Sequence, residues 1–173
     1  FRINTIPDTA ICLGDSVQLD VFGSPGSVYN WTPDAELSDN SIANPWATPS
    51  VTTTFTVSVA DNAGCNDQAE VEVTILTIPT TSFTYEVEPA CEGIYVELTN
   101  TSTDADSYVW TFNNDSTTTE EHPSVIFDYG SDYIIALEGT NDNGCFSGFT
   151  AIDLADSFDD YYSIRIPNVF TPN

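Results

Sequence analysis

The stretch VADNAGC, at residues 59–65, has a near copy in TNDNGC, at residues 140–145. In both copies a glycine directly precedes a cysteine and follows closely on an asparagine. Glycine and asparagine are typical of tight turns, because they adopt backbone conformations that other residues avoid. A turn signal that ends in cysteine and occurs twice predicts one structural unit built twice in the same chain.

The other cysteines follow the same repeat. Cys12 and Cys91 lie 79 residues apart, and Cys65 and Cys145 lie 80 residues apart. A tryptophan follows the first cysteine of each half after 19 residues. Two homologous units, joined near the segment LTIPTTS, account for these spacings.

Each half is predicted to consist of short β-strands. Apolar and polar residues alternate with a period of two in SVQLDV (16–21), FTVSVA (55–60) and AEVEVTI (69–75). No apolar stripe with helical spacing exceeds two turns. The predicted fold class is therefore all-β, as two tandem Ig-like β-sandwich domains with Trp31 and Trp110 in their cores.

The repeat also suggests how the cysteines pair. Four cysteines allow three pairings, and near-equal spacing in both halves favours one disulfide within each unit, Cys12–Cys65 and Cys91–Cys145. Reduced thiols in a cytosolic protein are the alternative. A zinc site is a weaker one, since no Cys-x-x-Cys pair is present. Disulfides would place the chain in an oxidising compartment.

The charge balance excludes several classes of partner. The 173 residues contain 27 carboxylates and two positively charged side chains, and the formal net charge is −25. Such a surface repels nucleic acid and anionic lipid. No apolar run is long enough to span a bilayer, so no direct membrane insertion is expected. The first residues resemble the middle of a protein, so we expect a fragment or a mature segment.

Candidate catalytic groups are few. His122 is the only histidine, and it lies before a proline in a predicted loop. Glu120 and Glu121 are adjacent and would face opposite ways on a strand, so they cannot act as a glycosidase pair. We expect a solvated loop histidine, no enzyme activity and no required cofactor.

Calcium binding and glycan binding are the remaining candidates for a ligand. The loops TDADSY (103–108) and SFDDYY (157–162) contain carboxylates that could ligate calcium. The candidate ligands are Asp104, Asp106, Asp159 and Asp160. Trp46 has no counterpart in the second half, so it is predicted at the surface, where it could contact surface glycans.

The second half resembles the PKD domain in the segment YVWTFNNDSTTTEEHPSVIFDYGSDYIIAL (108–137). The first half resembles the related Ig-like modules that are repeated in large surface proteins of gliding bacteria. The PKD resemblance rests on Trp110, Phe112, Pro123, Gly130, Tyr133, Ile135 and Leu137.

The end of the chain, SIRIPNVFTPN (163–173), resembles the opening of the gliding-motility-associated C-terminal domain, the type B sorting signal of type IX secretion. The repeat gives domains at 1–78 and 79–157, and the resemblance of the tail adds the start of a third, truncated domain at 158–173. It also implies outer-membrane type IX secretion or attachment proteins as partners. The sorting motif comprises Ile166, Pro167, Asn168, Phe170, Thr171, Pro172 and Asn173.

The same resemblance implies O-glycosylation at Asp-Ser/Thr sites, namely Thr9, Ser16 and Ser116. We therefore expect a non-catalytic spacer of a secreted, cell-surface adhesin, attached to the outer membrane, with neighbouring repeat modules as partners. The alternatives are the accessory modules of a large secreted hydrolase, or a module that itself binds calcium or glycans.

Overall fold

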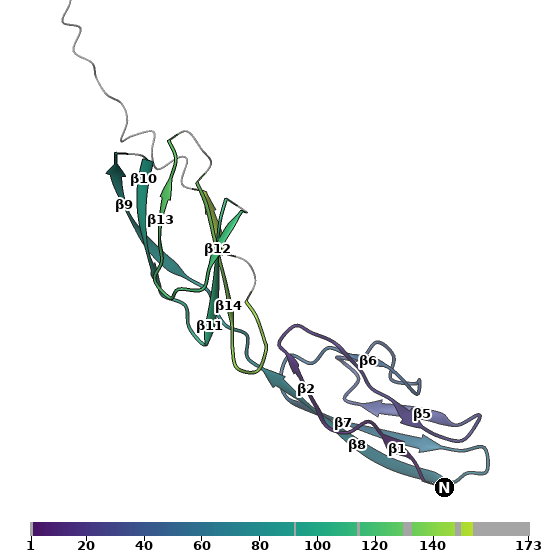
Figure 1. Cartoon of the computed structure of the whole chain (residues 1–173). Coiled ribbons are helices and arrows are strands. Elements are labelled where there is room, and N and C mark those ends of the chain that lie inside the picture. Colours follow the sequence, from purple (N-terminus) through teal and green to yellow (C-terminus); the bar gives the residue numbers. More distant parts are fainter. Residues whose placement is uncertain (1, 92, 114, 130–132, 148–149, 154–173) are drawn as a thin grey trace, which may run out of the picture. The chain divides into compact units, whose positions relative to one another are not determined.

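The computed structural model describes the chain except for residues 1, 92, 114, 130–132, 148–149 and 154–173. The chain divides into two compact units, of which the first is Phe1–Ile78 and the second begins at Pro79 (Figure 1). The regular elements of the described part are all β-strands, which confirms the all-β fold class. No helix in this part has the length and apolar character needed to cross a membrane.

Unit 1 is built around a four-stranded sheet in the order β2-β8-β7-β5, with two-stranded sheets β1-β4 and β3-β6 beside it. The long hairpin β7-β8 is antiparallel, whereas β2 pairs with β8 in parallel. The strands are β1 (Asn4–Thr5), β2 (Thr9–Cys12), β3 (Val17–Gln18), β4 (Val21–Phe22), β5 (Val28–Thr32), β6 (Trp46–Ala47), β7 (Thr53–Ala60) and β8 (Asn66–Leu76).

The alternation in the sequence determines which side chains of unit 1 face its core. Phe55, Val57 and Val59 on β7 are buried, and polar residues between them face outward. Trp31 is fully buried, and its Nε1–H donates a hydrogen bond to the Ile42 carbonyl at 2.9 Å. The indole of Trp31 is therefore buried with its N–H hydrogen-bonded, so no polar group is left unpaired in the core.

The predicted strand over 16–21 is interrupted. The structure has two short strands there, β3 and β4, while Leu19 N–H donates to the Pro45 carbonyl at 2.9 Å. Proline has no N–H to return a hydrogen bond, so the ladder is incomplete at Pro45. Beyond it, the Val21 N–H still donates to the Ala43 carbonyl at 3.1 Å. The inward side chains Leu19 and Val21 are nevertheless buried, as the alternation predicts.

Unit 2 is a sandwich of a three-stranded sheet, β13-β10-β9, and a four-stranded sheet, β12-β11-β14-β15. All of its strand pairs are antiparallel. The strands are β9 (Phe83–Ala90), β10 (Gly93–Asn100), β11 (Ser107–Phe112), β12 (Ser116–Thr118), β13 (Ser124–Phe127), β14 (Ile134–Thr140) and β15 (Thr150–Asp153).

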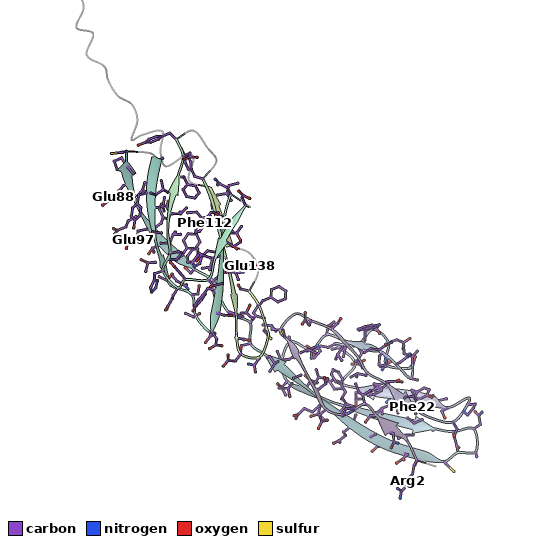
Figure 2. All side chains as sticks on the ribbon, viewed as in Figure 1. Arg2, Phe22, Glu88, Glu97, Phe112 and Glu138 are labelled. Atoms are coloured by element: carbon purple, nitrogen blue, oxygen red, sulfur yellow. The ribbon has the colours of Figure 1, made fainter. Side chains whose placement is uncertain are left out.

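The core of unit 2 is rich in aromatic residues. Trp110 is fully buried, and its ring meets Phe83 edge to face at a centroid distance of 5.1 Å. Figure 2 shows Phe112 between the two sheets, whereas Glu88 and Glu97 lie on the outside of the unit. Both core tryptophans are therefore where the sequence predicts them.

Candidate functional site

The repeated motif forms a turn at the end of the β7-β8 hairpin of unit 1. Asp61 Oδ1 accepts hydrogen bonds from the N–H groups of Ala63 and Cys65, both at 2.9 Å. Asp61 N–H in turn donates to the Cys65 carbonyl at 2.9 Å. Gly64 has φ of 86°, in the left-handed region that favours glycine.

The same turn occurs in unit 2, after β14. Asn141 Oδ1 accepts hydrogen bonds from the N–H groups of Asn143 and Cys145, at 3.2 and 3.0 Å. Asn141 N–H donates to the Cys145 carbonyl at 3.0 Å, and Gly144 has φ of 80°. Asp and Asn both offer a side-chain oxygen at this position, so the two turns are equivalent in geometry.

The predicted disulfide pairing is wrong. Cys12 and Cys145 are disulfide-bonded, whereas Cys65 and Cys91 have free, exposed thiols. Neither predicted pair, Cys12–Cys65 or Cys91–Cys145, is therefore formed. The reason lies in the strands that separate the two cysteines of each unit.

In unit 1, β8 lies between the two cysteines. Cys65 directly precedes the first residue of β8, and Cys12 is opposite Leu76, its last residue. A strand of eleven residues at about 3.3 Å per residue keeps them about 35 Å apart. A disulfide needs Cα atoms within about 7 Å of each other, so this pairing is excluded.

In unit 2, β9 has the same effect. Cys91 follows the last residue of β9. The turn that contains Cys145 lies at the other end, where a Cβ on Gly139 would be 3.1 Å from the Thr81 methyl group. The ten residues from Thr81 to Cys91 span about 30 Å as extended chain. Each unit therefore has its two cysteines at opposite ends.

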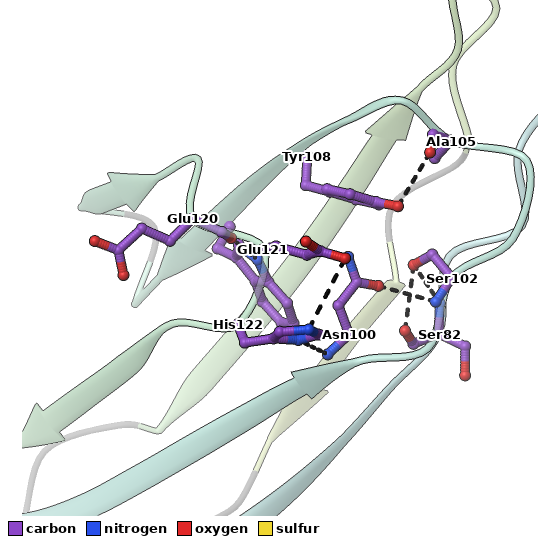
Figure 3. A network of polar contacts seen from close by, with 9 residues as sticks. Ser82, Asn100, Ser102, Ala105, Tyr108, Glu120, Glu121 and His122 are labelled. Atoms are coloured by element: carbon purple, nitrogen blue, oxygen red, sulfur yellow. Dashed lines mark hydrogen bonds and ion pairs between the residues drawn. The ribbon is translucent and has the colours of Figure 1, made fainter.

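His122 takes part in a network of contacts that holds a loop of unit 2 (Figure 3). Its Nδ1 accepts a hydrogen bond from the Asn100 N–H at 3.1 Å, and its Nε2 lies 3.8 Å from Glu121 Oε1. The neighbouring Glu120 carbonyl accepts the Nε1–H of Trp110 at 2.9 Å. These contacts join the loop before β13 to β10 and β11, and they bring no nucleophile to the imidazole.

The predicted calcium ligands are not assembled in the described part of the chain. Asp106 Oδ2 accepts a hydrogen bond from the Asp142 N–H at 2.7 Å, so it already stabilises the loop. Among described residues, no group of three or more His, Cys, Asp or Glu side chains could hold a metal. Asp104 is exposed, with φ of 60°. Asp159 and Asp160 lie outside the described residues, so calcium binding remains a prediction.

Neither of two surface hollows in the described part of the chain has the character of a ligand pocket. The first, of about 180 Å³, is smaller than the roughly 300–1,000 Å³ of typical ligand sites. Its lining residues are Phe112, Asn113, Asp115, Ser116, Val125, Ile126, Phe127 and Asp128.

The second hollow is an open depression of about 620 Å³ on the β7-β8 hairpin. Three of its four lining side chains, those of Ser58, Asp67 and Gln68, are engaged in hydrogen bonds. Gln68 Nε2 donates to Ser58 Oγ at 2.7 Å, and Asp67 Oδ2 accepts the Ile3 N–H at 3.2 Å. These hydrogen bonds connect β7 to β8 and tie the residue before β1 to β8.

Trp46 is at the surface, as predicted. Its side chain is half exposed on β6, where its residue is opposite Gln18 of β3. Gln18 Nε2 donates to the Asn44 carbonyl at 3.3 Å. A single ring without a second aromatic beside it on this ladder is a small contact area, and glycan binding remains a prediction.

The predicted modification sites differ in accessibility. Ser16 and Ser116 are exposed, and Ser116 begins β12. Thr9 is half buried within β2, where it is opposite Val73 of β8. The whole sorting motif, Ile166 to Asn173, lies outside the described residues.

No family model matches the chain, and no curated protein matches it significantly. Solved structures do match. The PKD1 domain from the Vibrio cholerae metalloprotease PrtV is 31% identical, with a TM-score of 0.37, over 44% of this chain and 95% of that domain. The PKD1 domain of Vibrio anguillarum Epp is 25% identical, with a TM-score of 0.35, over 44% and 92%.

An Ig-type structure, the amphioxus IgVJ-C2 molecule, is 12% identical, with a TM-score of 0.36, over 83% of this chain and 98% of that one. These TM-scores are too low to carry an argument about activity, so the architecture rests on the strand pairing described above. The chain thus consists of two all-β modules, similar in these comparisons to PKD and Ig-like domains.

Proposed function

We propose that this chain is a non-catalytic, load-bearing spacer of a secreted cell-surface adhesin, exported by type IX secretion and associated with gliding motility. A spacer of this kind must transmit tension along its length without unfolding. The pairing of β2, near the start of unit 1, with β8, its last strand, is the observation that carries the proposal.

These two strands are parallel neighbours. β2 pairs with β8 from Thr9–Val73 to Cys12–Leu76, and Leu13 N–H adds a hydrogen bond to the Leu76 carbonyl at 2.9 Å. Hydrogen bonds of a ladder lie across the strands. Tension on the two ends of the unit pulls parallel strands past each other, so the bonds share the load instead of breaking one at a time.

The surface charge fits the same role. With 27 carboxylates against two basic side chains, like charges keep the chain soluble and resist association. Among the described residues, His122 and Glu121 form an ion pair only when the imidazole is protonated. The stability of the units therefore comes from packed cores and strand ladders, which salt does not screen.

Two features support a location outside the cell. Cys12 and Cys145 are disulfide-bonded, and disulfides persist mainly in oxidising compartments. The tail 163–173 resembles a type IX sorting signal. Outer-membrane secretion or attachment proteins and neighbouring modules are then its partners, and O-glycans on Ser16 or Ser116 would be accessible at the surface.

Force spectroscopy tests the load-bearing role. The chain is pulled either through residues at the two ends of unit 1 or through Ala60 and Asn66, across the β7-β8 hairpin. We expect a higher unfolding force in the first geometry, because the β2-β8 ladder is sheared there and the hairpin is unzipped in the second. Equal forces would contradict the proposal.

Export is tested separately. The native protein is followed on intact cells by protease accessibility, in a type IX-competent strain and in one without the secretion pore. We expect the surface signal to disappear in the second strain. Unchanged surface exposure would remove type IX secretion from the proposal and leave the mechanical role standing.

A further inference from the structure

We propose that β9 of unit 2 binds an extended, basic segment of a partner protein, which adds to the sheet as a further strand. β9 is the outermost strand of the sheet β13-β10-β9, and β10 pairs with it along all eight of its residues (Figure 1). No described residue forms a strand ladder with its other side. The main-chain groups that point away from β10 form a free edge, which can pair with another chain.

The hydrogen bonds that flank β9 show which of its main-chain groups belong to the free edge. The Thr101 N–H donates to the Ser82 carbonyl at 2.9 Å, and Thr80 and Thr103 exchange hydrogen bonds of 3.0 and 2.9 Å, all in the register of the ladder. Bonded pairs alternate along an antiparallel ladder, so even-numbered residues of β9 bond to β10 and odd-numbered ones point outward. The residues with an outward N–H and C=O are Phe83, Tyr85 and Val87.

β9 is also the longest edge strand in the described part of the chain. The outermost strands β2, β5, β12, β13 and β15 of the other sheet edges have three to five residues. On β5, moreover, the Trp31 N–H already donates to the Asn40 carbonyl at 2.9 Å. A partner strand loses conformational freedom when it pairs, so it needs several ladder bonds in compensation. Among these edges, β9 offers the most.

The inner face of β9 determines one half of the partner's pattern. Phe83 and Val87 pack against the core of unit 2, whereas Tyr85, on the same face, is 40% exposed. Side chains directly opposite each other on neighbouring strands lie on the same face. An added strand would therefore cover Tyr85 with its own inward side chains, which should be apolar.

The outer face of β9 determines the other half. Glu86 and Glu88 are exposed there, and Glu97 of β10 is directly opposite Glu86. Like charges that face each other destabilise a ladder, and no lysine or arginine occurs between residues 79 and 153 to offset them. Lysine or arginine at alternate positions of an added strand would lie beside Glu86 and Glu88.

The same charges disfavour a second copy of this chain as the occupant. Each copy has 27 carboxylates and two positively charged side chains. Pairing of two β9 strands would place Glu86 and Glu88 of each copy beside those of the other. Charged residues on an edge strand commonly prevent such self-pairing. The partner is therefore a segment with apolar and basic residues at alternate positions.

The test uses the full chain and a peptide as long as β9, eight residues of alternating valine and lysine with blocked ends. In the added strand the valine amides face Phe83, Tyr85 and Val87, and the lysine amides face the solvent. NMR hydrogen exchange should show that the peptide protects the amides of these three residues. N-methylation of the valine amides should weaken binding roughly tenfold or more. N-methylation of the lysine amides should leave it unchanged.

Variants of the protein test the edge and the charges separately. Tyr85→Pro removes an outward N–H that does not bond to β10, while Tyr85→Thr keeps the N–H and loses only the ring. The peptide should bind Tyr85→Pro more weakly than Tyr85→Thr. Glu86→Gln combined with Glu88→Gln should weaken binding about twofold to fivefold. If Tyr85→Pro does not fold, the two N-methylated peptides still test the edge on the unmodified chain.

Four results would overturn the inference. Equal binding of the two N-methylated peptides would mean that charge alone attracts them. Equal binding of an alternating valine and glutamate peptide would remove the basic partner, and a lack of protection at the three amides would remove the edge. Dimers that protect the same amides without peptide would make a second copy the occupant. Peptide binding does not depend on the load-bearing role, so this experiment and force spectroscopy can fail independently.

Discussion

Replacing Asp61 by alanine tests whether the cysteine-bearing turn is stabilised by one side chain. Asp61 Oδ1 accepts two main-chain N–H groups, those of Ala63 and Cys65, at 2.9 Å each. The Asp61→Ala variant removes both bonds but leaves the backbone and Gly64 unchanged. The turn lies at the end of the β7-β8 hairpin, so its loss should weaken unit 1 and leave unit 2 intact.

The expected loss in free energy of unfolding depends on how exposed the turn is to water. A hydrogen bond to a charged group contributes about 1.5–3 kcal/mol when it is protected. Here both amides belong to exposed residues and can bind water once they are released. The analogous loss of an aspartate at a helix N-cap costs about 1 kcal/mol. We therefore expect unit 1 to lose about 1–2 kcal/mol of its free energy of unfolding.

The other repeat provides the matched control. Asn141 performs the same task in unit 2 with an amide oxygen, so Asp61→Asn should cost less than about 0.5 kcal/mol. Urea unfolding followed by tryptophan fluorescence measures both variants. With a slope near 1 kcal/mol per molar urea, Asp61→Ala should lower the midpoint of unit 1 by about 1–2 M.

Two outcomes would refute this reasoning. An equal loss in Asp61→Ala and Asp61→Asn would mean that the negative charge, and not the oxygen position, stabilises the turn. No loss in Asp61→Ala would mean that the backbone and Gly64 alone determine the turn. Either result would also remove the structural basis for treating the two turns as equivalent.

Two further predictions concern single side chains. A Cβ added at Gly93 would clash with the Phe127 carbonyl oxygen on the neighbouring strand β13. Gly93→Ala should therefore destabilise unit 2 by about 1–3 kcal/mol in the same urea assay. An unchanged midpoint would show that β13 can move away at no cost in stability. The Ser41 hydroxyl, and then its N–H, hold the pKa of the Asp39 carboxyl below its usual value. The stability from this contact is present above the unfolded-state pKa and lost as the pH falls through the lowered folded-state pKa. Ser41→Ala should raise the pKa of Asp39 in an NMR titration, and an unmoved pKa would contradict the assigned cause.

The sequence by itself determined the features that depend on nearby residues. The duplicated turns form where the motif predicts them, because an Asp or Asn oxygen and a glycine three residues later are enough to close each turn. The core residues of β7 and β14 follow from the period of two, since alternate side chains of a strand face opposite sides. Trp31 and Trp110 are buried for the same reason.

Only the tertiary structure decided the state of the cysteines and the role of His122. Equal spacing along the chain shows that cysteines correspond between repeats, but a disulfide depends on which strand ends meet in space. Strand pairing places Cys12 opposite Leu76, a full strand away from Cys65, and it brings the His122 loop against Asn100. Both arrangements arise from contacts between residues far apart in sequence, for which local spacing carries no signal.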